Sequence, residues 1–254
     1  MKLKQFIYDL CCVYLPAIFQ PTAAPVFCNA KRIRPRMRRE NRPSQTKFSR
    51  TVKEWVMTVG IIGAGNIGGA FATALAKAGI EAVIANSRGP ESLTMLVSKL
   101  GSTIRAGSLQ EAAAQDIVLV AVPWSKIPGA LAGLNFDGKI VIDSNNSIEA
   151  PLYRPADLGG RTSTEIFTAL VPGARVVKAF NHLTPKQLSG DPRSEGGRRV
   201  LFYSGNDMRA KAEVAAIIDR LGFFGIDLGG LAVGSQLVQF PGGPLPALNL
   251  VKFD

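Results

Sequence analysis

The chain has 254 residues, enough to bury a sizeable core as one large domain or two small ones. Its formal net charge of +11 is concentrated at the start, because the first 56 residues hold 12 of the 30 Lys and Arg but only three of the 19 Asp and Glu. The remainder is nearly neutral, so no nucleic-acid partner is expected. All three cysteines precede residue 57 and the single histidine is His182, which excludes a disulfide framework, thiol chemistry and a Cys/His zinc site from the body; no metal is expected.

Residues 1–55 form a basic N-terminal extension that we expect to be disordered. Their apolar stretch, residues 6–19, is broken by Asp9 and Pro16 and is too short to span a membrane. Three alternatives are a secretory signal, an Arg-rich organelle transit peptide and a translation start at Met57. We favour the start at Met57, and with it a cytoplasmic location and no membrane span.

The most informative segment reads TVGIIGAGNIGG at residues 58–69. A strand, a glycine turn and a helix start follow one another, a context that makes G-x-G-x-x-G a strong dinucleotide-binding pattern. Gly63 permits the tight turn, Gly65 leaves room for a pyrophosphate, and Gly68 lets the helix lie close to the sheet. The helix N-terminus adds amide donors and a partial positive charge. The cofactor-binding residues predicted here are Gly63, Gly65, Asn66, Ile67 and Gly68.

The end of the second predicted strand indicates which dinucleotide is bound. An NAD site carries an Asp or Glu there for the ribose 2′-hydroxyl, whereas this chain has Asn86, Ser87 and Arg88. A hydroxyl and a guanidinium suit a 2′-phosphate, and Asn86 adds an amide donor. We therefore predict NADP rather than NAD; the alternative is a capped turn with a solvated Arg88.

Strand and helix patterns alternate along the body, which is typical of an α/β fold with helices on both faces of the sheet. We predict a Rossmann-type, doubly wound and mostly parallel sheet, with a small C-terminal α/β portion. Strands are expected at residues 57–62, 82–86, 103–106, 116–122, 139–143, 175–180, 199–204 and 224–228. Helices are expected at residues 66–78, 91–100, 108–114, 126–133, 163–170 and 208–221.

The predicted division places an NADP-binding domain at residues 56–180 and a substrate-cleft portion at residues 181–254. After Asp227 the chain becomes rich in Gly and Pro and cannot form a regular central strand. This segment either covers the crevice where ligands bind or braces the C-terminal part without a role in chemistry.

Ligands of open α/β sheets bind outside the carboxyl ends of the strands. Ala121, Val122 and Pro123 end the fourth predicted strand and are expected to border the nicotinamide. Ser144 and Asn145 end the fifth and suit hydrogen bonds to a ribose or a carboxamide, although such residues are also ordinary turn formers.

The sixth predicted strand ends at Asn181 and His182, which are the candidate catalytic residues. His182 has an unperturbed pKa near neutrality, but a structural histidine in a loop is the alternative. Lys178 either faces the site or sits at a strand edge. Tyr153 and Tyr203 lack the Y-x-x-x-K spacing of alcohol dehydrogenases, which favours redox chemistry between two carriers.

From residue 57 to residue 252 the chain resembles the NADP-dependent coenzyme F420 oxidoreductases. The resemblance rests on residues 59–68, 86–89, 121–123, 177–181 and 203–207 and on the Gly-rich C-terminal stretch. It implies that Ser87 and Arg88 hold the 2′-phosphate and that hydride passes between the nicotinamide and a deazaflavin ring. The polar residues 143–146 depart from the apolar segment expected there, which leaves the second substrate open.

The reading is thus an NADP-dependent oxidoreductase whose partner is a small redox molecule, coenzyme F420 or a flavin-like ring. One alternative is an imine or carbonyl reductase like pyrroline-5-carboxylate reductase; another is a non-catalytic NADP(H)-sensing module. A membrane-bound ferric reductase would need transmembrane helices, which are not predicted. A homodimer is an option that the sequence leaves open.

Overall fold

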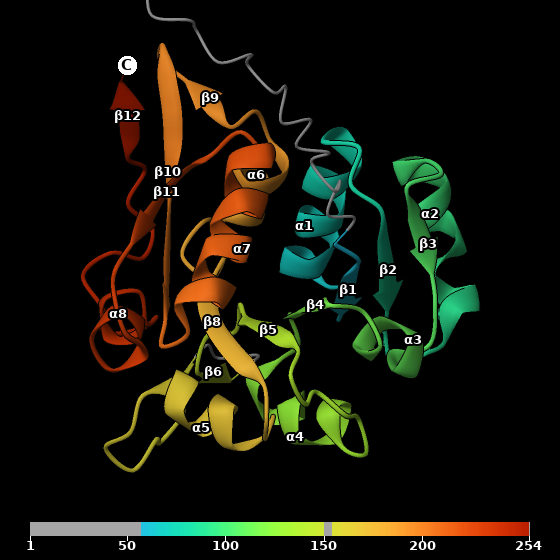
Figure 1. Ribbon diagram of the computed structural model, residues 1–254, viewed down its shortest axis with the longest axis horizontal. Helices are drawn as coiled ribbons and strands as arrows, with labels where there is room; N and C mark the ends of the chain where they lie inside the picture. The colour runs from blue at the N-terminus through green and yellow to red at the C-terminus, as the bar shows by residue number, and fades with distance from the viewer. Residues whose placement is uncertain (1–56, 150–153, 254) are drawn as a thin grey trace, which may run out of the picture. The chain divides into compact units, whose positions relative to one another are not determined.

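The computed structural model describes residues 57–149 and 154–253 (Figure 1). The predictions made for the basic extension and its cysteines lie outside the described residues, as does Tyr153.

One sheet organises the described residues, with the strand order β11-β10-β8-β5-β4-β1-β2-β3. The six adjacent strands β8, β5, β4, β1, β2 and β3 all run parallel to one another. Strand β10 runs antiparallel to β8, and β11 is parallel to β10. The mostly parallel Rossmann-type sheet predicted from the sequence is therefore confirmed. Its strands are β1 (Val59–Ile62), β2 (Ala82–Ala85), β3 (Ile104–Ala106), β4 (Ile117–Val120), β5 (Ile140–Asp143), β8 (Arg175–Ala179), β10 (Gly197–Gly205) and β11 (Phe224–Asp227).

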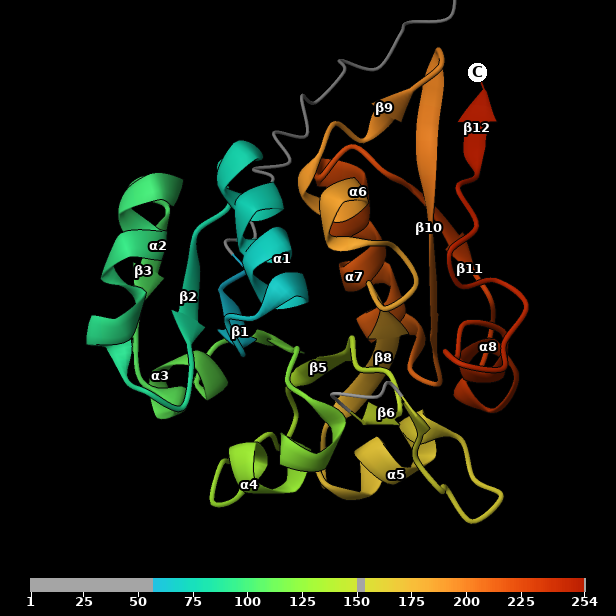
Figure 2. The ribbon, with the colours of Figure 1, turned by 180° about the vertical axis from the view of Figure 1, so that it is seen from behind.

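Helices cover both faces of the sheet (Figures 1 and 2). On one face lie α1 (Asn66–Lys77), α2 (Thr94–Leu100), α6 (Pro185–Ser189) and α7 (Met208–Arg220), which contribute to a first apolar cluster. On the other lie α3 (Leu109–Ala113), α4 (Ile127–Leu131), α5 (Ser163–Ala169) and α8 (Leu231–Leu237), which contribute to a second. Two short 3₁₀ turns, η1 (Pro90–Leu93) and η2 (Trp124–Lys126), precede α2 and α4.

The two clusters follow from the strand sequences. Side chains alternate between the faces of a strand, so a central strand must be apolar at every position to bury both. In β1, Ile61 belongs to the first cluster and Ile62 to the second; in β5, Ile142 and Val141 divide in the same way. The short unbroken apolar runs are thus the consequence of a sheet covered on both sides.

The structure adds elements that the sequence did not predict. They are the helices α6 and α8 and the short strands β6 (Ile148–Glu149), β7 (Arg154–Pro155), β9 (Arg193–Ser194) and β12 (Val251–Phe253). Strands β9 and β12 both pair antiparallel with β10, while β6 pairs with β7. Two or three residues give too little alternation to be recognised in a sequence.

Helix α8 lies in the Gly-rich segment after Asp227, where a cover or a brace was expected. Gly234 allows it to lie directly on β10, since a Cβ at that position would be 2.3 Å from the Cβ of Ser204. Gly234 makes the helix harder to recognise in the sequence, but it permits the close packing of α8 against β10. The sheet continues across residue 180 from β8 to β10. The domain boundary placed there stays a prediction.

Candidate functional site: a cavity at the carboxyl ends of the strands

The glycine turn joins β1 to α1 under tight steric limits. Gly63 has a φ of +105°, and a Cβ there would lie 2.1 Å from the carbonyl oxygen of Ala121. A Cβ at Gly68 would lie 1.8 Å from the carbonyl oxygen of Gly63, so this glycine is needed for contact between the helix and the turn. A Cβ at Gly65 would meet nothing within 4 Å. Gly63 and Gly68 are needed for the fold, whereas Gly65 leaves open space above the backbone.

The N-terminus of α1 has no side-chain cap and no acidic residue in its first turn. The first amide groups of a helix have no intrahelical partner, and the helix dipole gives this end a partial positive charge. The turn is therefore suited to an anion such as a pyrophosphate.

A cavity of about 650 Å³ lies beside this turn. It brings together eight of the residues predicted to bind the cofactor, which are Gly63, Gly65, Asn86, Ser87, Arg88, Ala121, Val122 and Pro123. Asn66, Ile67 and Gly68 lie in the first turn of α1 and are not among the lining residues. Ser144, Asn145, Asn181 and His182 do not line it either.

The sequence reading missed several lining residues, namely Leu109, Ser125, Lys126, Gly129 and Ala130. They belong to the segments that follow β3 and β4 and so reach the same edge of the sheet. Ser125 and Lys126 lie just after the predicted strand end at Pro123, and this position could have identified them as lining residues.

The loop after β2 is shaped by Asn86. Its side-chain oxygen accepts a hydrogen bond from the backbone N–H of Arg88 at 2.9 Å, and its Nδ2 donates to the hydroxyl of Ser92 at 2.9 Å. The Asn86 amide is thus used to fold the turn. Within the described part of the chain, the side chains of Arg88 and Lys126 form no hydrogen bond or ion pair, and both line the cavity. Two cationic groups therefore face the same space with their donors unused.

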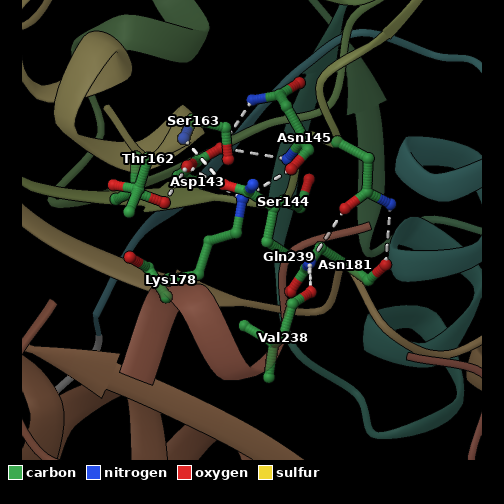
Figure 3. A network of polar contacts seen from close by, with 12 residues as sticks. Asp143, Ser144, Asn145, Thr162, Ser163, Lys178, Asn181, Val238 and Gln239 are labelled. Atoms are coloured by element: carbon green, nitrogen blue, oxygen red, sulfur yellow. Dashed lines mark hydrogen bonds and ion pairs between the residues drawn. The ribbon is translucent and has the colours of Figure 1, made fainter. Parts of the chain in front are cut away.

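A buried polar network joins residues at the ends of β5 and β8 (Figure 3). The side chains of Lys178 and Asp143 are 0% exposed, and their Nζ and Oδ2 atoms are 3.0 Å apart. Thr164 donates to the same carboxylate oxygen at 2.9 Å, while the backbone N–H and the Nδ2 of Asn145 donate to the other. Lys178 also donates to the carbonyl oxygen of Asn145. Lys178 is not at the edge of the sheet, because β8 lies between β5 and β10; its ammonium group is buried and does not line the cavity.

Ser144 and Asn145 also belong to this buried layer. The hydroxyl of Ser144 donates to the carbonyl oxygen of Val120 at 2.7 Å. The Oδ1 of Asn145 accepts from the backbone N–H of Val122 at 3.0 Å. In this structure both side chains hold the end of β4; their predicted contact with a cofactor stays a prediction.

Asn181 fastens the C-terminal segment to the strand ends. Its Nδ2 donates to the Oδ1 of Asn146 at 2.9 Å and to the carbonyl oxygen of Val238 at 2.6 Å. Close by, the backbone N–H of Ser163 donates to the Oε1 of Gln239 at 2.9 Å (Figure 3). The segment after α8 thus braces the end of β8 and the start of α5.

His182 lies away from the cavity, with 3% of its surface exposed. Its Nε2 accepts from the backbone N–H of Phe202 at 3.4 Å, and its ring packs against the Phe202 ring at 5.0 Å. Burial lowers the pKa of His182 to about 4, although a backbone hydrogen bond at Val200 opposes the shift. The imidazole is therefore neutral at pH 7. The catalytic role assigned to His182 and Asn181 stays a prediction.

Two further findings bear on the class of protein. Among residues 57–149 and 154–253, no three His, Cys, Asp or Glu side chains gather as a metal site would require. In the same residues, no helix has both the length and the apolar character needed to cross a bilayer.

The sheet, the glycine turn and the cavity at the strand ends define a Rossmann-type nucleotide-binding protein. Residues 58–147 match the family described as NADP oxidoreductase, coenzyme F420-dependent. The resemblance inferred from the motifs is thereby confirmed.

Two curated relatives are metalloreductases. The chain is 30% identical to rat Metalloreductase STEAP3 over 193 residues, which are 74% of this chain and 37% of that protein. It is 25% identical to mouse Metalloreductase STEAP2 over 188 residues, or 73% of this chain and 36% of that protein. The chain thus spans little more than a third of the length of these relatives.

Solved structures extend the comparison. A hypothetical protein from Sinorhizobium meliloti is 48% identical, with a TM-score of 0.74, over 77% of this chain and 96% of that one. A proposed F420-dependent NADP reductase from Arthrobacter sp. FB24 is 28% identical, with a TM-score of 0.60, over 69% and 86%. A reductive aminase from Aspergillus terreus, in complex with NADPH, is 21% identical with a TM-score of 0.53 over 71% and 58%, and shares the fold.

Proposed function

We propose that the chain binds NADP(H) in the 650 Å³ cavity and transfers a hydride between the nicotinamide and a second small molecule, coenzyme F420 or a flavin-like ring. The observation that carries the proposal is the presence of an anion-binding helix N-terminus and the unpaired Arg88 in one cavity. The family description, which names both NADP and coenzyme F420, agrees with it.

The residues present fit a nucleotide with three anionic groups. The open space above Gly65 and the free amides of α1 suit the pyrophosphate. Ser87 and Arg88 offer a hydroxyl and a guanidinium for the 2′-phosphate, and no carboxylate stands at this strand end to hold a ribose 2′-hydroxyl. The fit therefore favours NADP over NAD.

The nicotinamide half would extend toward Ala121, Val122 and Pro123, which form the wall at the end of β4. When bound, the dinucleotide supplies the hydride. The chain's own part is to bind the nucleotide, fix the orientation of its ring and exclude water from one side of it.

The second substrate is proposed from the chemistry of the wall. Among the described residues that line the cavity there is no Asp, Glu, His, Tyr or Cys. Reduction of a carbonyl to an alcohol needs a proton donor, whereas hydride transfer between two rings does not. Lys126 is the only lining side chain among these residues that could serve as a general acid, and the scarcity of such groups favours a ring acceptor such as F420 over an imine or a carbonyl.

The test uses the full-length protein with NADPH and oxidised F420 under anaerobic conditions. NADPH loss and deazaflavin bleaching are followed together, with NADH, FMN and riboflavin as comparison reactants. Coupled loss at equal rates supports the F420 reaction, and coupled loss with FMN or riboflavin supports a flavin-like acceptor. NADPH binding without turnover of any acceptor would replace the proposal by the sensing module, while an absence of NADPH binding would overturn it.

A further inference from the structure

We propose that Asn145 is a positioning residue for the nicotinamide half of the nucleotide. The side chain of Asn145 connects the buried pair of Lys178 and Asp143, which Figure 3 shows, to the backbone N–H of Val122 and so fixes the backbone of the cavity wall. The inference rests on the proposed function, and it assigns to Asn145 a role exerted without contact to the nucleotide.

The contacts form one continuous chain across three strands. Lys178 on β8 is 3.0 Å from Asp143 at the end of β5. Asp143 accepts from the Nδ2 of Asn145 at 2.9 Å, and the Oδ1 of Asn145 accepts from the N–H of Val122 at 3.0 Å. Val122 lies two residues beyond the end of β4 and lines the cavity. The last contact therefore joins the buried network to the wall.

The orientation of the Asn145 amide is determined by its partners. Its nitrogen faces a carboxylate, which only accepts, and its oxygen faces a backbone N–H, which only donates. Rotating the amide by 180° would place donor against donor and acceptor against acceptor. The carboxylate is itself immobilised by Lys178 and Thr164. The side-chain amide of Asn145 is thus held in one orientation, and its Oδ1 fixes the position of the Val122 N–H.

The backbone at Val122 has no alternative partner in the sheet. The N–H of Ala121 still bonds to the carbonyl oxygen of Ile62 in β1, but the next N–H is taken by the Asn145 side chain. Pro123 follows and has no N–H. Without Asn145, the wall would lose its last hydrogen bond before the proline.

This part of the wall also touches the glycine turn. A Cβ at Gly63 would meet the carbonyl oxygen of Ala121 at 2.1 Å and the Cγ1 of Val122 at 2.9 Å. A shift of Val122 would therefore change the space available between the turn and the wall. Arg88 and Ser87 are attached to β2, on the far side of β1 from this segment, so their position does not depend on it.

The experiment compares two ligands and two variants of the full-length protein. NADPH occupies the whole site, whereas 2′,5′-ADP carries the 2′-phosphate but lacks the nicotinamide half. Asn145→Leu removes the acceptor for Val122, and Ser235→Ala is the control because it removes a buried hydroxyl bond inside α8 that involves neither Asp143 nor the wall. We expect Asn145→Leu to weaken NADPH binding about tenfold, the effect of one lost hydrogen bond, and to leave 2′,5′-ADP binding unchanged. Ser235→Ala should change neither.

Equal weakening of both ligands by Asn145→Leu, or no change in either, would overturn the inference, as would the same selective loss in Ser235→Ala. Wild-type protein that binds neither ligand would overturn the proposed function along with it. These outcomes are distinguishable because the first three keep nucleotide binding in the wild type. If Asn145→Leu does not fold, Asn145→Ser is expected to show the same ligand selectivity with less steric change.

A third variant gives a readout that loss of stability would not produce. In Asn145→Asp, the new carboxyl group faces the carboxylate of Asp143, whose other oxygen is paired with the ammonium of Lys178. When protonated it can donate to Asp143 and accept from Val122, as the amide does; when ionised it repels Asp143. NADPH affinity relative to wild type should therefore recover as the pH is lowered. A pH-independent ratio would contradict the inference.

Discussion

Asn146 and Asn181, which are 35 residues apart in the chain, bond to each other twice. The Nδ2 of Asn146 donates to the carbonyl oxygen of Asn181 at 3.0 Å, and the Nδ2 of Asn181 donates to the Oδ1 of Asn146 at 2.9 Å. The pair closes the gap between the ends of β5 and β8, at the edge of the sheet where the nucleotide is proposed to bind. Rigid strand ends of this kind are what a site built for orientation requires.

Arg88→Ala tests the 2′-phosphate site. The loss of a charged hydrogen bond should weaken NADPH binding by roughly 1.5–3 kcal/mol, while NADH binding barely changes. Titration of both nucleotides by calorimetry measures the difference. Arg105→Ala is the control, since this exposed arginine pairs with Glu111 and lies outside the cavity. Equal losses for NADPH and NADH in Arg88→Ala would refute the assignment.

Three glycine substitutions separate folding from binding. Gly65→Ala adds a methyl group to open space, so the free energy of unfolding should change by less than about 0.5 kcal/mol while NADPH binding falls. Gly68→Ala forces a clash with the carbonyl of Gly63 and should destabilise the protein. Gly69→Ala meets nothing within 4 Å inside α1, and should raise stability by about 0.5–1 kcal/mol without affecting the nucleotide. Urea unfolding and NADPH titration of each variant provide the two readouts; unchanged binding in Gly65→Ala would contradict the proposed pyrophosphate position.

Lys178→Met should cost about 3–5 kcal/mol of stability, because it leaves the Asp143 carboxylate buried without its cation. The double variant Lys178→Met with Asp143→Leu should recover part of this loss, since no buried charge then remains. Arg198→Ala breaks an ion pair whose Asp219 side chain is 72% exposed, and should cost only about 0–1 kcal/mol. Chemical denaturation at neutral pH compares the three; a small effect of Lys178→Met would mean that the pair is not held as the structure shows.

His182 predicts a pH dependence of stability. Its folded pKa of about 4 lies below the ordinary value of 6.5, so the unfolded chain binds the proton more tightly. The stabilisation is complete above pH 6.5 and declines as the pH falls toward 4, by an amount on the order of 3 kcal/mol at pH 4. The chain has one histidine, so its proton resonance reports the pKa directly.

His182→Gln keeps an acceptor for the N–H of Phe202 and removes the titrating group. Its unfolding free energy should therefore depend less on pH between 6.5 and 4 than that of the wild type. An unchanged slope would show that other groups cause the acid sensitivity. The same variant tests the catalytic prediction, which expects a lower kcat at pH 7 with unaltered NADPH affinity.

The strands were predictable because β1, β2, β4 and β5 are short apolar runs that a doubly covered sheet demands. The nucleotide turn was predictable because its glycines, its strand and its helix are contiguous. The same holds for Ser87 and Arg88, which follow directly on a strand end.

Other features depend on partners remote in sequence. Nothing around Asn145 indicates that its amide turns toward Asp143 and Val122, and nothing near Lys178 reveals a bond to a residue 33 positions away. Helix α8 was not predicted because it contains Gly234 and follows a Gly-rich stretch. Only the packed structure shows that Gly234 is required for close contact with Ser204. The polar strand ends were thus recognisable as a group, while the direction of each side chain required the packed structure.

The hydrogen bonds from Asn181 to Asn146 and from Ser163 to Gln239 have a consequence for protein engineering. A chimera that joins the first half of this chain to the second half of a relative at residue 180 would exchange one side of each bond but not the other. The transplanted segment would then lack matching partners after β5 and at the start of α5. Recombination between family members should therefore succeed only where these junction residues are moved as a set.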